Sequence, residues 1–555
     1  MNILELENKK NGKTLWDKKK KKVKKKLMKY WGYPTLKPKQ IEIISNFVNG
    51  KDVIGLLPTG YGKSMCYLIP PLITKKTIFI ISPLISLMDD QKEKLLRKGI
   101  PVSALHGNNS RKDKEVFEII DGKIKIVYMS PEYLINGDGL DLAKTLVKDN
   151  NLGYFAVDES HCISVWGHDF RKSYLRLYKF RKKFPQIPVL AVTATATKVV
   201  VDEIDKYLKM KDRVLVTANF DRPNLYIKCV NVKHENIKKK GLKFCVNGCL
   251  HVLKDSGKCK KCKINPKEYN YSLDELEDLE NNTKRHPVTP YTKMELMQKW
   301  LNKYDGHKII IYTASRKSCV EIAEQINEKK KKSALAYHAG MSKKLREKLQ
   351  LQFSDGKINI IVSTIAFGMG IDQIVRCVLI FDAASSIEEY YQQIGRAGRD
   401  HKPAETILFY NKQKLVVSMK MMEKDIKNPE LKRIKKTNFH KMMELCEQVG
   451  CRRRFILEYF QERAPKFFNC DNCDNCCERK LVDFTPQFWD ILYNNKKIKS
   501  TLDMNYINVY KSNNLLKGDK KYFITDFLKY WKGFIKFKKY DLNSIPDNLK
   551  IRLYV

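Results

Sequence analysis

Two consecutive acidic residues, Asp158 and Glu159, are the strongest candidates for catalytic residues in the sequence. They directly follow an apolar stretch, Tyr154 to Val157, with the length and composition of a buried strand. A carboxylate at the end of such a strand can hold a magnesium ion, and a second can orient the water that attacks a phosphate. We therefore expect Asp158 to bind Mg²⁺ and Glu159 to position the water.

A glycine-rich turn supplies a matching phosphate site. It follows a second apolar stretch, Asp52 to Leu57, and its glycines let backbone N–H groups curl around phosphate oxygens. Its lysine would reach the outer phosphates and its serine would bind Mg²⁺. The strict pattern is not met, because Leu57 stands where the first glycine is usual. The residues expected at the phosphates are Pro58, Thr59, Gly60, Tyr61, Gly62, Lys63 and Ser64.

Two arginines three positions apart, Arg396 and Arg399, lie in the segment Gln392-Gln-Ile-Gly-Arg-Ala-Gly-Arg-Asp400. Arginines that project from one domain toward a nucleotide on another stabilise the charge that develops on the transferred phosphate. The alternative is a basic surface turn. A glutamine just before a phosphate loop can also read an adenine edge. We assign Gln40, Asp372 and Gln392 to the same nucleotide site.

An aromatic loop follows the acidic pair. Flat rings beside a guanidinium are suited to stacking on unpaired bases. The competing interpretation is a loop with chance aromatics. Hydroxyl residues at other strand ends, as in Ser82-Pro-Leu, could contact a phosphate backbone. The residues expected to contact nucleic acid are His161, Trp166, Phe170, Arg171, Ser82 and Arg316, and His168 lies in the same aromatic loop.

The composition points to a polyanionic partner. The chain has 555 residues, with 106 Lys and Arg against 62 Asp and Glu, which gives a net charge of +44. Such an excess favours nucleic acid over an acidic membrane surface. No apolar run approaches the ~18 residues of a membrane helix, and no apolar core follows the N-terminal charges. We expect a soluble intracellular protein without a membrane partner, with the nucleus and the cytoplasm both open.

The cysteines indicate zinc, because disulfides are rare in a reducing compartment. Eight of the fifteen fall in two groups of four. Thiolates at these spacings suit tetrahedral zinc. For the second group, His251 is an alternate ligand, and the competing interpretation is a flexible insertion with incidental thiols. The first group is Cys451, Cys470, Cys473 and Cys476, and the second is Cys245, Cys249, Cys259 and Cys262.

The order of elements predicts two α/β units. β-branched runs alternate with helix-length polar segments, a pattern typical of parallel sheets covered by helices on both faces. The pattern restarts after Asp221-Arg-Pro-Asn-Leu225. The expected strands are 52–57, 77–82, 125–130, 154–157 and 189–193 in the first unit, and 308–313, 334–337, 359–363, 377–381 and 406–410 in the second.

Together these segments resemble the RecQ group of superfamily 2 DNA helicases, over roughly residues 30–476. The most specific pieces are His161-Cys-Ile-Ser-Val-Trp-Gly-His-Asp-Phe-Arg171, Ala366-Phe-Gly-Met-Gly-Ile-Asp372 and Tyr390-Tyr-Gln-Gln-Ile-Gly-Arg-Ala-Gly-Arg-Asp400. The resemblance implies two RecA-like domains with ATP between them, 3′→5′ travel, and a zinc module after the motor. The chain departs from the family at Ser160 (usually alanine), Val165 (usually glutamine) and Lys37 (usually arginine).

The expected domains follow from these segments. Residues 1–29 are a solvated, partly helical arm with eight lysines between Lys18 and Lys26. Residues 30–217 and 218–425 are the RecA-like domains, the second interrupted by the Cys-rich insertion 232–291. Residues 426–480 form the zinc module. Residues 481–555 form a short basic C-terminal domain, expected to be a reduced winged helix.

The sequence therefore predicts an ATP-dependent DNA helicase that uses ATP, Mg²⁺ and Zn²⁺ and acts on single-stranded DNA and tailed duplexes. An RNA helicase or RNA-dependent ATPase is the first alternative, because such motors grip mainly phosphates. A nucleic-acid-binding scaffold with a vestigial motor is the second, and the intact Lys63, Asp158, Glu159 and Arg399 argue against it. Nothing in the sequence indicates a protein partner.

Overall fold

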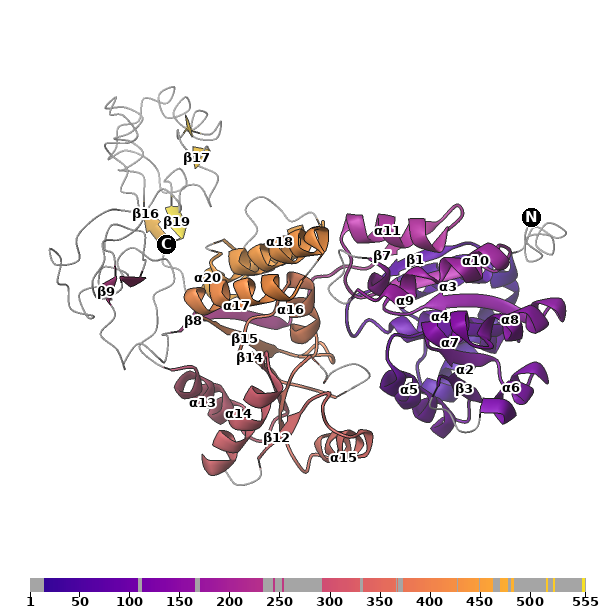
Figure 1. Ribbon diagram of the computed structural model, residues 1–555, viewed down its shortest axis with the longest axis horizontal. Coiled ribbons are helices and arrows are strands. Elements are labelled where there is room, and N and C mark those ends of the chain that lie inside the picture. Colours follow the sequence, from indigo (N-terminus) through magenta and orange to yellow (C-terminus); the bar gives the residue numbers. More distant parts are fainter. Residues whose placement is uncertain are drawn as a thin grey trace.

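Two α/β domains lie side by side, and a helical module covers part of the second (Figure 1). The computed structural model describes residues 14–107, 112–164, 170–232, 292–329, 333–365, 367, 373–426, 428–448, 450–462 and 470–477. It also places short strands, as backbone alone, at 243–244, 252–253, 481–483, 516–517, 523–524 and 552–554. The part described contains no helix that is both long and apolar enough to cross a membrane.

The first domain is built on a seven-stranded, wholly parallel sheet in the order β3-β4-β2-β5-β6-β1-β7. Its side chains alternate between faces, so that Ile78 and Ile80 enter one core cluster while Phe79 and Ile81 enter the other. Both faces are therefore buried, as expected for a parallel sheet. The strands are β1 (Val53–Leu56), β2 (Thr77–Ile81), β3 (Val102–Leu105), β4 (Ile126–Met129), β5 (Leu152–Val157), β6 (Val189–Thr193) and β7 (Val214–Thr217).

Helices cover both faces of this sheet (Figure 1). They are α2 (Leu15–Trp31), α3 (Pro38–Val48), α4 (Lys63–Thr74), α5 (Ile85–Arg97), α6 (Lys112–Ile120), α7 (Pro131–Asn136), α8 (Gly139–Lys148), the 3₁₀ turn η1 (Ser160–Ile163), α9 (Lys172–Leu175), α10 (Tyr178–Lys183) and α11 (Lys198–Leu208).

The second domain repeats the design with a six-stranded parallel sheet in the order β12-β13-β11-β14-β15-β8. Its strands are β8 (Leu225–Asn231), β11 (Ile309–Tyr312), β12 (Ala334–Tyr337), β13 (Ile360–Ser363), β14 (Cys377–Ile380) and β15 (Ala404–Tyr410). Its helices are α13 (Lys293–Lys303), α14 (Arg316–Lys329), α15 (Lys343–Ser354), α16 (Ile387–Ile394) and α17 (Lys412–Asp425). The two-domain parallel fold predicted from the sequence is confirmed.

The helical module consists of α18 (Pro429–Cys446), α19 (Arg452–Tyr459) and α20 (Asp474–Cys477). The other short strands pair antiparallel: β9 (Lys243–Phe244) with β10 (Val252–Leu253), β16 (Leu481–Asp483) with β19 (Arg552–Tyr554), and β17 (Leu516–Lys517) with β18 (Phe523–Ile524). The rest of the insertion and of the predicted C-terminal domain lies outside the described residues.

The structure differs from the sequence-based expectation in two respects. Three strands of the two parallel sheets, β3, β7 and β8, were not predicted. In addition, the N-terminal lysine-rich segment is not a solvated arm, because α2 buries Val23 and Leu27 against the first domain. Two apolar residues four positions apart suffice to dock one face of a helix, even among lysines.

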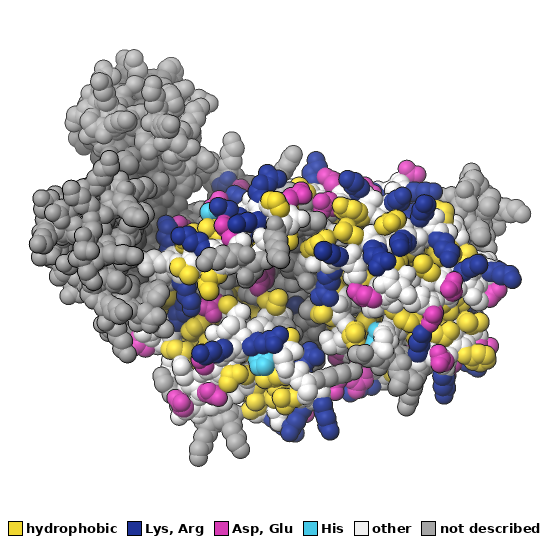
Figure 2. All heavy atoms as spheres, in the orientation of Figure 1, with side chains coloured by type: hydrophobic (Ala, Val, Ile, Leu, Met, Phe, Trp, Pro, Cys, Tyr) yellow, Lys and Arg dark blue, Asp and Glu magenta, His cyan; other side chains and the backbone are white. Residues whose placement is uncertain are grey.

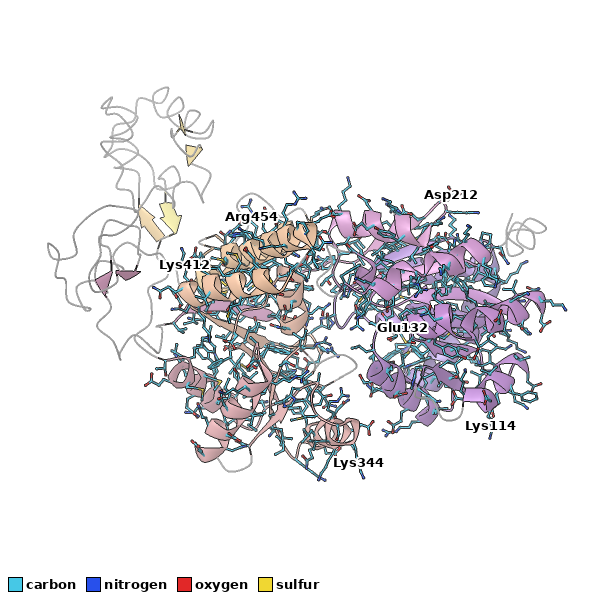
Figure 3. All side chains as sticks on the ribbon, viewed as in Figure 1. Lys114, Glu132, Asp212, Lys344, Lys412 and Arg454 are labelled. Carbon is cyan, nitrogen blue, oxygen red and sulfur yellow. The ribbon has the colours of Figure 1, made fainter. Side chains whose placement is uncertain are left out.

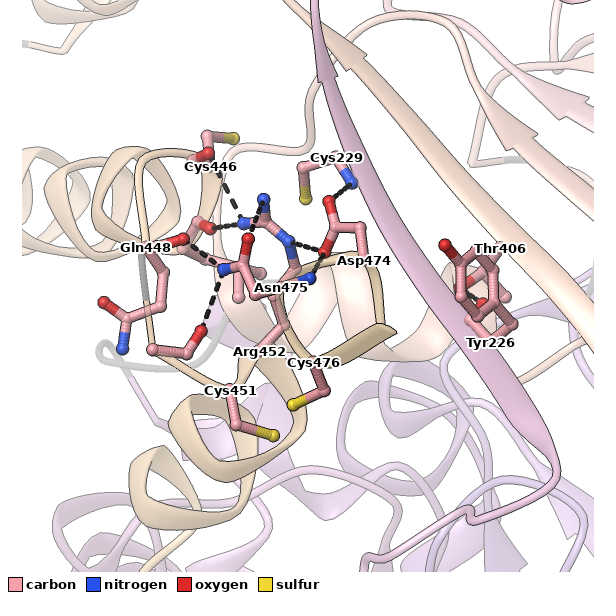
Figure 4. Close-up of polar contacts among 12 residues, drawn as sticks. Tyr226, Cys229, Thr406, Cys446, Gln448, Cys451, Arg452, Asp474, Asn475 and Cys476 are labelled. Atoms are coloured by element: carbon pink, nitrogen blue, oxygen red, sulfur yellow. Dashed lines mark hydrogen bonds and ion pairs between the residues drawn. The ribbon is translucent and has the colours of Figure 1, made fainter. Parts of the chain in front are cut away.

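A buried ion pair lies within the helical module, and its carboxylate also bonds the second domain. Arg452 has no exposed surface, and its Nε donates to Asp474 Oδ1 at 2.5 Å. The other carboxylate oxygen of Asp474 accepts from the backbone N–H of Cys229, on β8, at 3.0 Å. Figure 4 shows this network, with Asn475 completing it. Asp474 therefore satisfies a buried guanidinium and a buried strand edge together.

We predict that Asp474→Ala lowers the free energy of unfolding by about 3–5 kcal/mol, because it leaves the charge of Arg452 buried without a partner. Chemical denaturation of the full chain, with zinc content measured in parallel, tests this. The matched control is Glu444→Ala, which removes an exposed pair with Lys441 and should cost less than about 1 kcal/mol. Equal losses in the two variants would contradict the role of the buried pair.

Candidate active site

The phosphate loop lies between β1 and the first turn of α4. Gly60 and Gly62 have φ of 83° and 92°, in the left-handed region that favours glycine. Helix α4 begins at Lys63, so its unpaired N–H groups and the positive end of its dipole point at the loop. The loop and helix together form a site for an anion, and the backbone geometry fits a nucleotide phosphate.

Gln40 holds this loop in place through hydrogen bonds to its backbone. Its Nε2 donates to the carbonyl oxygens of Tyr61 and Gly62 at 3.1 and 3.0 Å, and its Oε1 accepts from the N–H of Lys37 at 2.9 Å. A side chain added at Gly62 would lie 2.7 Å from the same Nε2. Gln40 thus lies against the phosphate loop, and its amide bonds the loop itself. Contact with an adenine edge stays a prediction.

The two acids lie at the end of β5, separated from the phosphate loop by one strand, β6. Asp158 is buried, and its carboxylate accepts from the Tyr67 hydroxyl at 3.1 Å and from the N–H of Glu159 at 3.0 Å. Burial, with a further contribution from the charge of Glu159, raises the pKa of Asp158 to about 6. Tyr67, on α4, was missed by sequence reasoning, because a tyrosine in an apolar helix reads as core.

Lys63 and Glu159 form an ion pair within the site. Lys63 Nζ lies 3.0 Å from Glu159 Oε1, and His161 Nδ1 lies 3.4 Å from Glu159 Oε2 and 2.7 Å from Thr193 Oγ1. Glu159 itself has φ 45° and ψ 48°, a left-handed conformation that is rare for a residue with a side chain. Lys63, which we expect to bind the phosphates, and Glu159, which we expect to orient the water, thus neutralise each other in this structure.

The second domain reaches this site through the end of α16. A side chain added at Gly395 would lie 3.0 Å from Thr59 Cβ, and one added at Gly60 would lie 3.6 Å from Arg399 Cγ. Gln392 Nε2 donates across the cleft to Thr195 Oγ1 at 3.4 Å. Arg399 therefore lies beside the phosphate loop, as an arginine finger requires.

Arg396 is half-buried, as Arg399 is. Burial raises the pKa of Tyr312, and the charges of both arginines oppose that shift. The described contacts bring Arg399, but not Arg396, to the loop. Asp372, the remaining predicted nucleotide residue, lies outside the described residues.

Arg222 is a further residue that sequence reasoning missed. Its guanidinium donates to Thr59 O at 3.3 Å, and to Ala397 O and Gly398 O at 2.9 Å each. It therefore joins the phosphate loop to the turn that carries Arg396 and Arg399, which we call the arginine turn. The signal was present in Asp221-Arg-Pro-Asn-Leu225, but that segment was used only as a boundary.

The zinc module also contacts the segment that contains Arg222. This segment, residues 218–224, is the linker between β7 of the first domain and β8 of the second. Arg453 Nη1 lies 2.9 Å from Asp221 Oδ1, Nη2 donates to Leu225 O at 2.6 Å, and Nη1 also bonds Arg222 O. The ring of Phe220 stacks on that of Phe460 with centroids 4.9 Å apart. The linker between the domains is thus fixed by the module that follows them.

The residues expected to touch nucleic acid are only partly brought together. Arg171 Nη1 donates to Pro83 O at 2.6 Å, so the end of the aromatic loop is tied to the loop that carries Ser82. The Ser82 hydroxyl is buried and has no hydrogen-bond partner among the described residues. Phe170 is half-buried, and Arg316 is exposed in the second domain. Trp166 and His168 lie outside the described residues.

Glu132 lies on the side of the first domain that is nearest the second (Figure 3). It belongs to the segment Ser130-Pro-Glu132. Ser130 caps α7 by accepting from the N–H of Tyr133 at 3.1 Å. Its hydroxyl is therefore used inside the domain, as is that of Thr193.

Four cysteines form one compact group. The Sγ atoms of Cys451, Cys470, Cys473 and Cys476 all lie within 4.8 Å of one another. Thiolates 2.3 Å from a tetrahedral zinc ion are about 3.8 Å apart, and Cys470 Sγ lies 3.8 Å from Cys476 Sγ. The group fits a structural Zn²⁺. The second predicted set, Cys245, Cys249, Cys259 and Cys262, lies outside the described residues.

Comparison with known families supports this assembly. The DEAD/DEAH box helicase family matches residues 37–204, the helicase conserved C-terminal domain matches 292–401, and the RecQ zinc-binding family matches 413–477. The three matches coincide with the phosphate-loop domain, the arginine-turn domain and the cysteine module.

Similar whole proteins combine the same parts. The chain is 34% identical over 82% of its length to a putative ATP-dependent RNA helicase of Acanthamoeba polyphaga mimivirus, of which it covers 72%. It is 33% identical over 86% of its length to the ATP-dependent DNA helicase RecQ of Haemophilus influenzae, of which it covers 66%.

A solved structure shares the fold. The DUF1998 helicase MrfA bound to DNA matches with a TM-score of 0.50 at 16% identity, over 91% of this chain and 59% of that one. With both RecA-like domains, the four-cysteine module and these relatives, the chain belongs to the RecQ family of ATP-dependent helicases.

Proposed function

We propose that this protein is an ATP-dependent DNA helicase that travels 3′→5′ along a single strand and unwinds duplex DNA. The observation that carries the proposal is the composite cleft: Lys63 and Glu159 on one domain, with Arg399 of the other beside the phosphate loop. Closing and opening such a cleft around ATP moves the two domains relative to each other. Two domains that grip one strand can step along it in this way.

The residues take the following roles in this proposal. Lys63 and the loop from Pro58 to Gly62 hold the phosphates, and Ser64 and Asp158 hold Mg²⁺. The metal neutralises charge on the phosphates when it is bound. Glu159 orients the attacking water, and Arg399, with Arg396 when the cleft closes, stabilises the charge that develops on the terminal phosphate.

The ion pair implies an order of events. Because Lys63 bonds Oε1 of Glu159 in the structure, phosphate that draws Lys63 away frees this oxygen to accept a hydrogen bond from water. Hydrolysis without correctly seated phosphates is thereby disfavoured. We assign Arg222, which contacts Thr59 and the arginine turn, to holding the two halves in register.

DNA is the proposed substrate because the zinc module accompanies the motor, and because the Haemophilus relative is named a DNA helicase. RNA is the second candidate, because the viral relative is named a putative RNA helicase. Action inside the cell, in nucleus or cytoplasm, is consistent with the four cysteines, none of which forms a disulfide. A second zinc on the insertion cysteines stays a prediction.

We predict that Glu159→Gln lowers kcat for ATP by orders of magnitude and leaves ATP affinity within a few fold, because the amide keeps the shape but cannot act as the base. Lys63→Ala should instead lose ATP binding as well. Steady-state ATPase and nucleotide titration separate these effects. Normal turnover by Glu159→Gln would eliminate its assigned role.

We predict an acid limb in kcat/KM for ATP near pH 6 when Mg²⁺ is below saturation. Asp158 has a raised pKa, so its carboxylate is lost as the pH falls through about 6, and a protonated carboxyl cannot bind the metal. Saturating Mg²⁺ should move the limb to lower pH, because metal competes with protons. Tyr67→Phe should move it to higher pH, because the lost hydrogen bond favours the charged form. An acid limb whose pH is unchanged both by saturating Mg²⁺ and by Tyr67→Phe would disprove the assignment of Asp158 as a ligand of the metal.

We predict that single-stranded DNA stimulates the ATPase more than RNA of the same sequence, and that duplexes with a 3′ single-stranded tail are unwound. Parallel assays with 3′-tailed, 5′-tailed and blunt duplexes test direction and substrate together. Stimulation by RNA alone would replace the DNA proposal with the RNA one. Unwinding of 5′-tailed duplexes alone would reverse the direction.

A further inference from the structure

Helix α2 is fixed to the first domain at several points. Its apolar face buries Val23 and Leu27 against the core cluster that contains α3 and α4. Near its start, the N–H of Trp16 donates to Asn49 Oδ1 at 3.1 Å. Near its end, Lys98 Nζ donates to Tyr30 O at 3.0 Å. The orientation of its other face is therefore set by the fold.

That other face is a stripe of lysines. Five lysines spaced three or four residues apart share one side of a helix, opposite the buried positions. All five are exposed. We call them the α2 stripe: Lys18, Lys21, Lys22, Lys25 and Lys29.

The α2 stripe has no counter-charge within the described chain. Of the lysines on α2, only Lys20 pairs with a carboxylate, Asp17 at 3.4 Å, among the residues that the structure describes. Elsewhere the visible surface mixes basic and acidic side chains (Figure 2), with pairs such as Lys39–Glu42 at 2.8 Å. Like charges at these helical spacings destabilise a helix, so the stripe lowers the stability of the folded chain.

We propose that the α2 stripe binds the phosphate backbone of double-stranded DNA next to the motor. From Lys18 to Lys29 a helix rises about 16 Å, a length over which a duplex presents about ten phosphate charges. Lysine is a mobile point charge that suits such a row without needing a fixed register. The inference rests on the proposed function, because it takes DNA as the substrate.

Other polyanions fit the stripe less well. A helix that binds a membrane surface inserts its apolar face, but the apolar face of α2 is occupied by the core of the first domain. A single strand is held by stacking on aromatic rings, whereas the ring beside the stripe, that of Tyr30, lies under Lys29 Nζ at 5.2 Å. A protein interface is centred on aromatic or arginine anchors, which the stripe lacks. A backbone of phosphates needs only positive charge.

The position of α2 suits contact with the duplex part of a substrate. Helix α5 starts just after the Ser82 loop, and the residue that follows α5, Lys98, contacts the end of α2. The thirteen residues of α5 span about 20 Å, the length of about six base pairs. A tailed duplex is long enough to lie on the stripe while its strand is in the motor.

The test is a quadruple substitution, Lys18→Gln, Lys21→Gln, Lys22→Gln and Lys25→Gln, in the full chain. Its control removes the same number of charges from exposed lysines of α8 and α10: Lys144→Gln, Lys148→Gln, Lys179→Gln and Lys182→Gln. Binding of a blunt DNA duplex is measured over a range of salt. Because each neutralised phosphate adds about 0.9 to the slope of log affinity against log salt, the α2 variant should lose about 2–4 from that slope. The control should lose less than about 1.

Three further readings make the outcome decisive. Neither variant should unfold at a lower temperature than the parent, because the α2 variant loses only repulsion between like charges, and ATPase stimulation by single-stranded DNA should persist in both. Equal duplex affinity and equal salt slopes in the two variants would overturn the proposal and leave α2 a solvated face. Loss of binding to phosphatidylserine vesicles with unchanged duplex binding would overturn it in favour of a membrane surface. A parent that DNA does not stimulate would instead refute the proposed function.

Discussion

A guanidinium removed from water must give its N–H donors to acceptors, and this constraint organises the centre of the molecule. Arg222 gives its donors to carbonyls of the phosphate loop and of the arginine turn. Arg453 of the zinc module bonds Asp221 and the carbonyls of Arg222 and Leu225. Motor, linker and zinc module therefore share one set of bonds. The four-cysteine module thereby bears on the geometry of the nucleotide site.

The same reasoning applies to the charges at the nucleotide site. Lys63 and Glu159 are both mostly buried, each with about a sixth of its side chain exposed, at 16% and 17%. Either one left alone there would be costly. Pairing them stabilises the site without nucleotide, whereas a move of Lys63 onto phosphate would leave the Glu159 carboxylate without its cation. Asp158 is less well compensated, which is why burial raises its pKa, and bound magnesium would supply the missing positive charge.

Much of the fold could be predicted because its signals are local. Alternating apolar runs gave strands such as β6 and β12 with their observed bounds, and the glycines at 60 and 62 marked a turn that adopts left-handed backbone. β8 was missed although its residues alternate between buried and half-buried over most of its length, because the segment that leads into it, Asp221-Arg-Pro-Asn-Leu225, was used only as a boundary between the two units.

The site was predicted less completely than the fold for a related reason. Lys63, Glu159 and the four cysteines stand in short motifs whose chemistry is evident. Arg222, Arg453 and Tyr67 act through backbone carbonyls or through one carboxylate oxygen in another element. Their residue types carry no signal of this, because an arginine in a linker and a tyrosine in a helix are ordinary. The reverse error occurred at α2, where the lysines concealed two residues that dock the helix.

The bonds of Arg222 are unequal, and the inequality bears on how the cleft works. Its two bonds within the second domain are 2.9 Å, whereas the bond to Thr59 in the first domain is 3.3 Å. Longer hydrogen bonds are weaker, so separation of the domains would break the contact with the phosphate loop and leave Arg222 on the arginine turn. The guanidinium then moves with Arg399, because the carbonyls that hold it belong to the residues just before that arginine. Closure therefore brings Arg222 and Arg399 to the phosphate loop as one unit, and a linker fixed by the zinc module sets their approach.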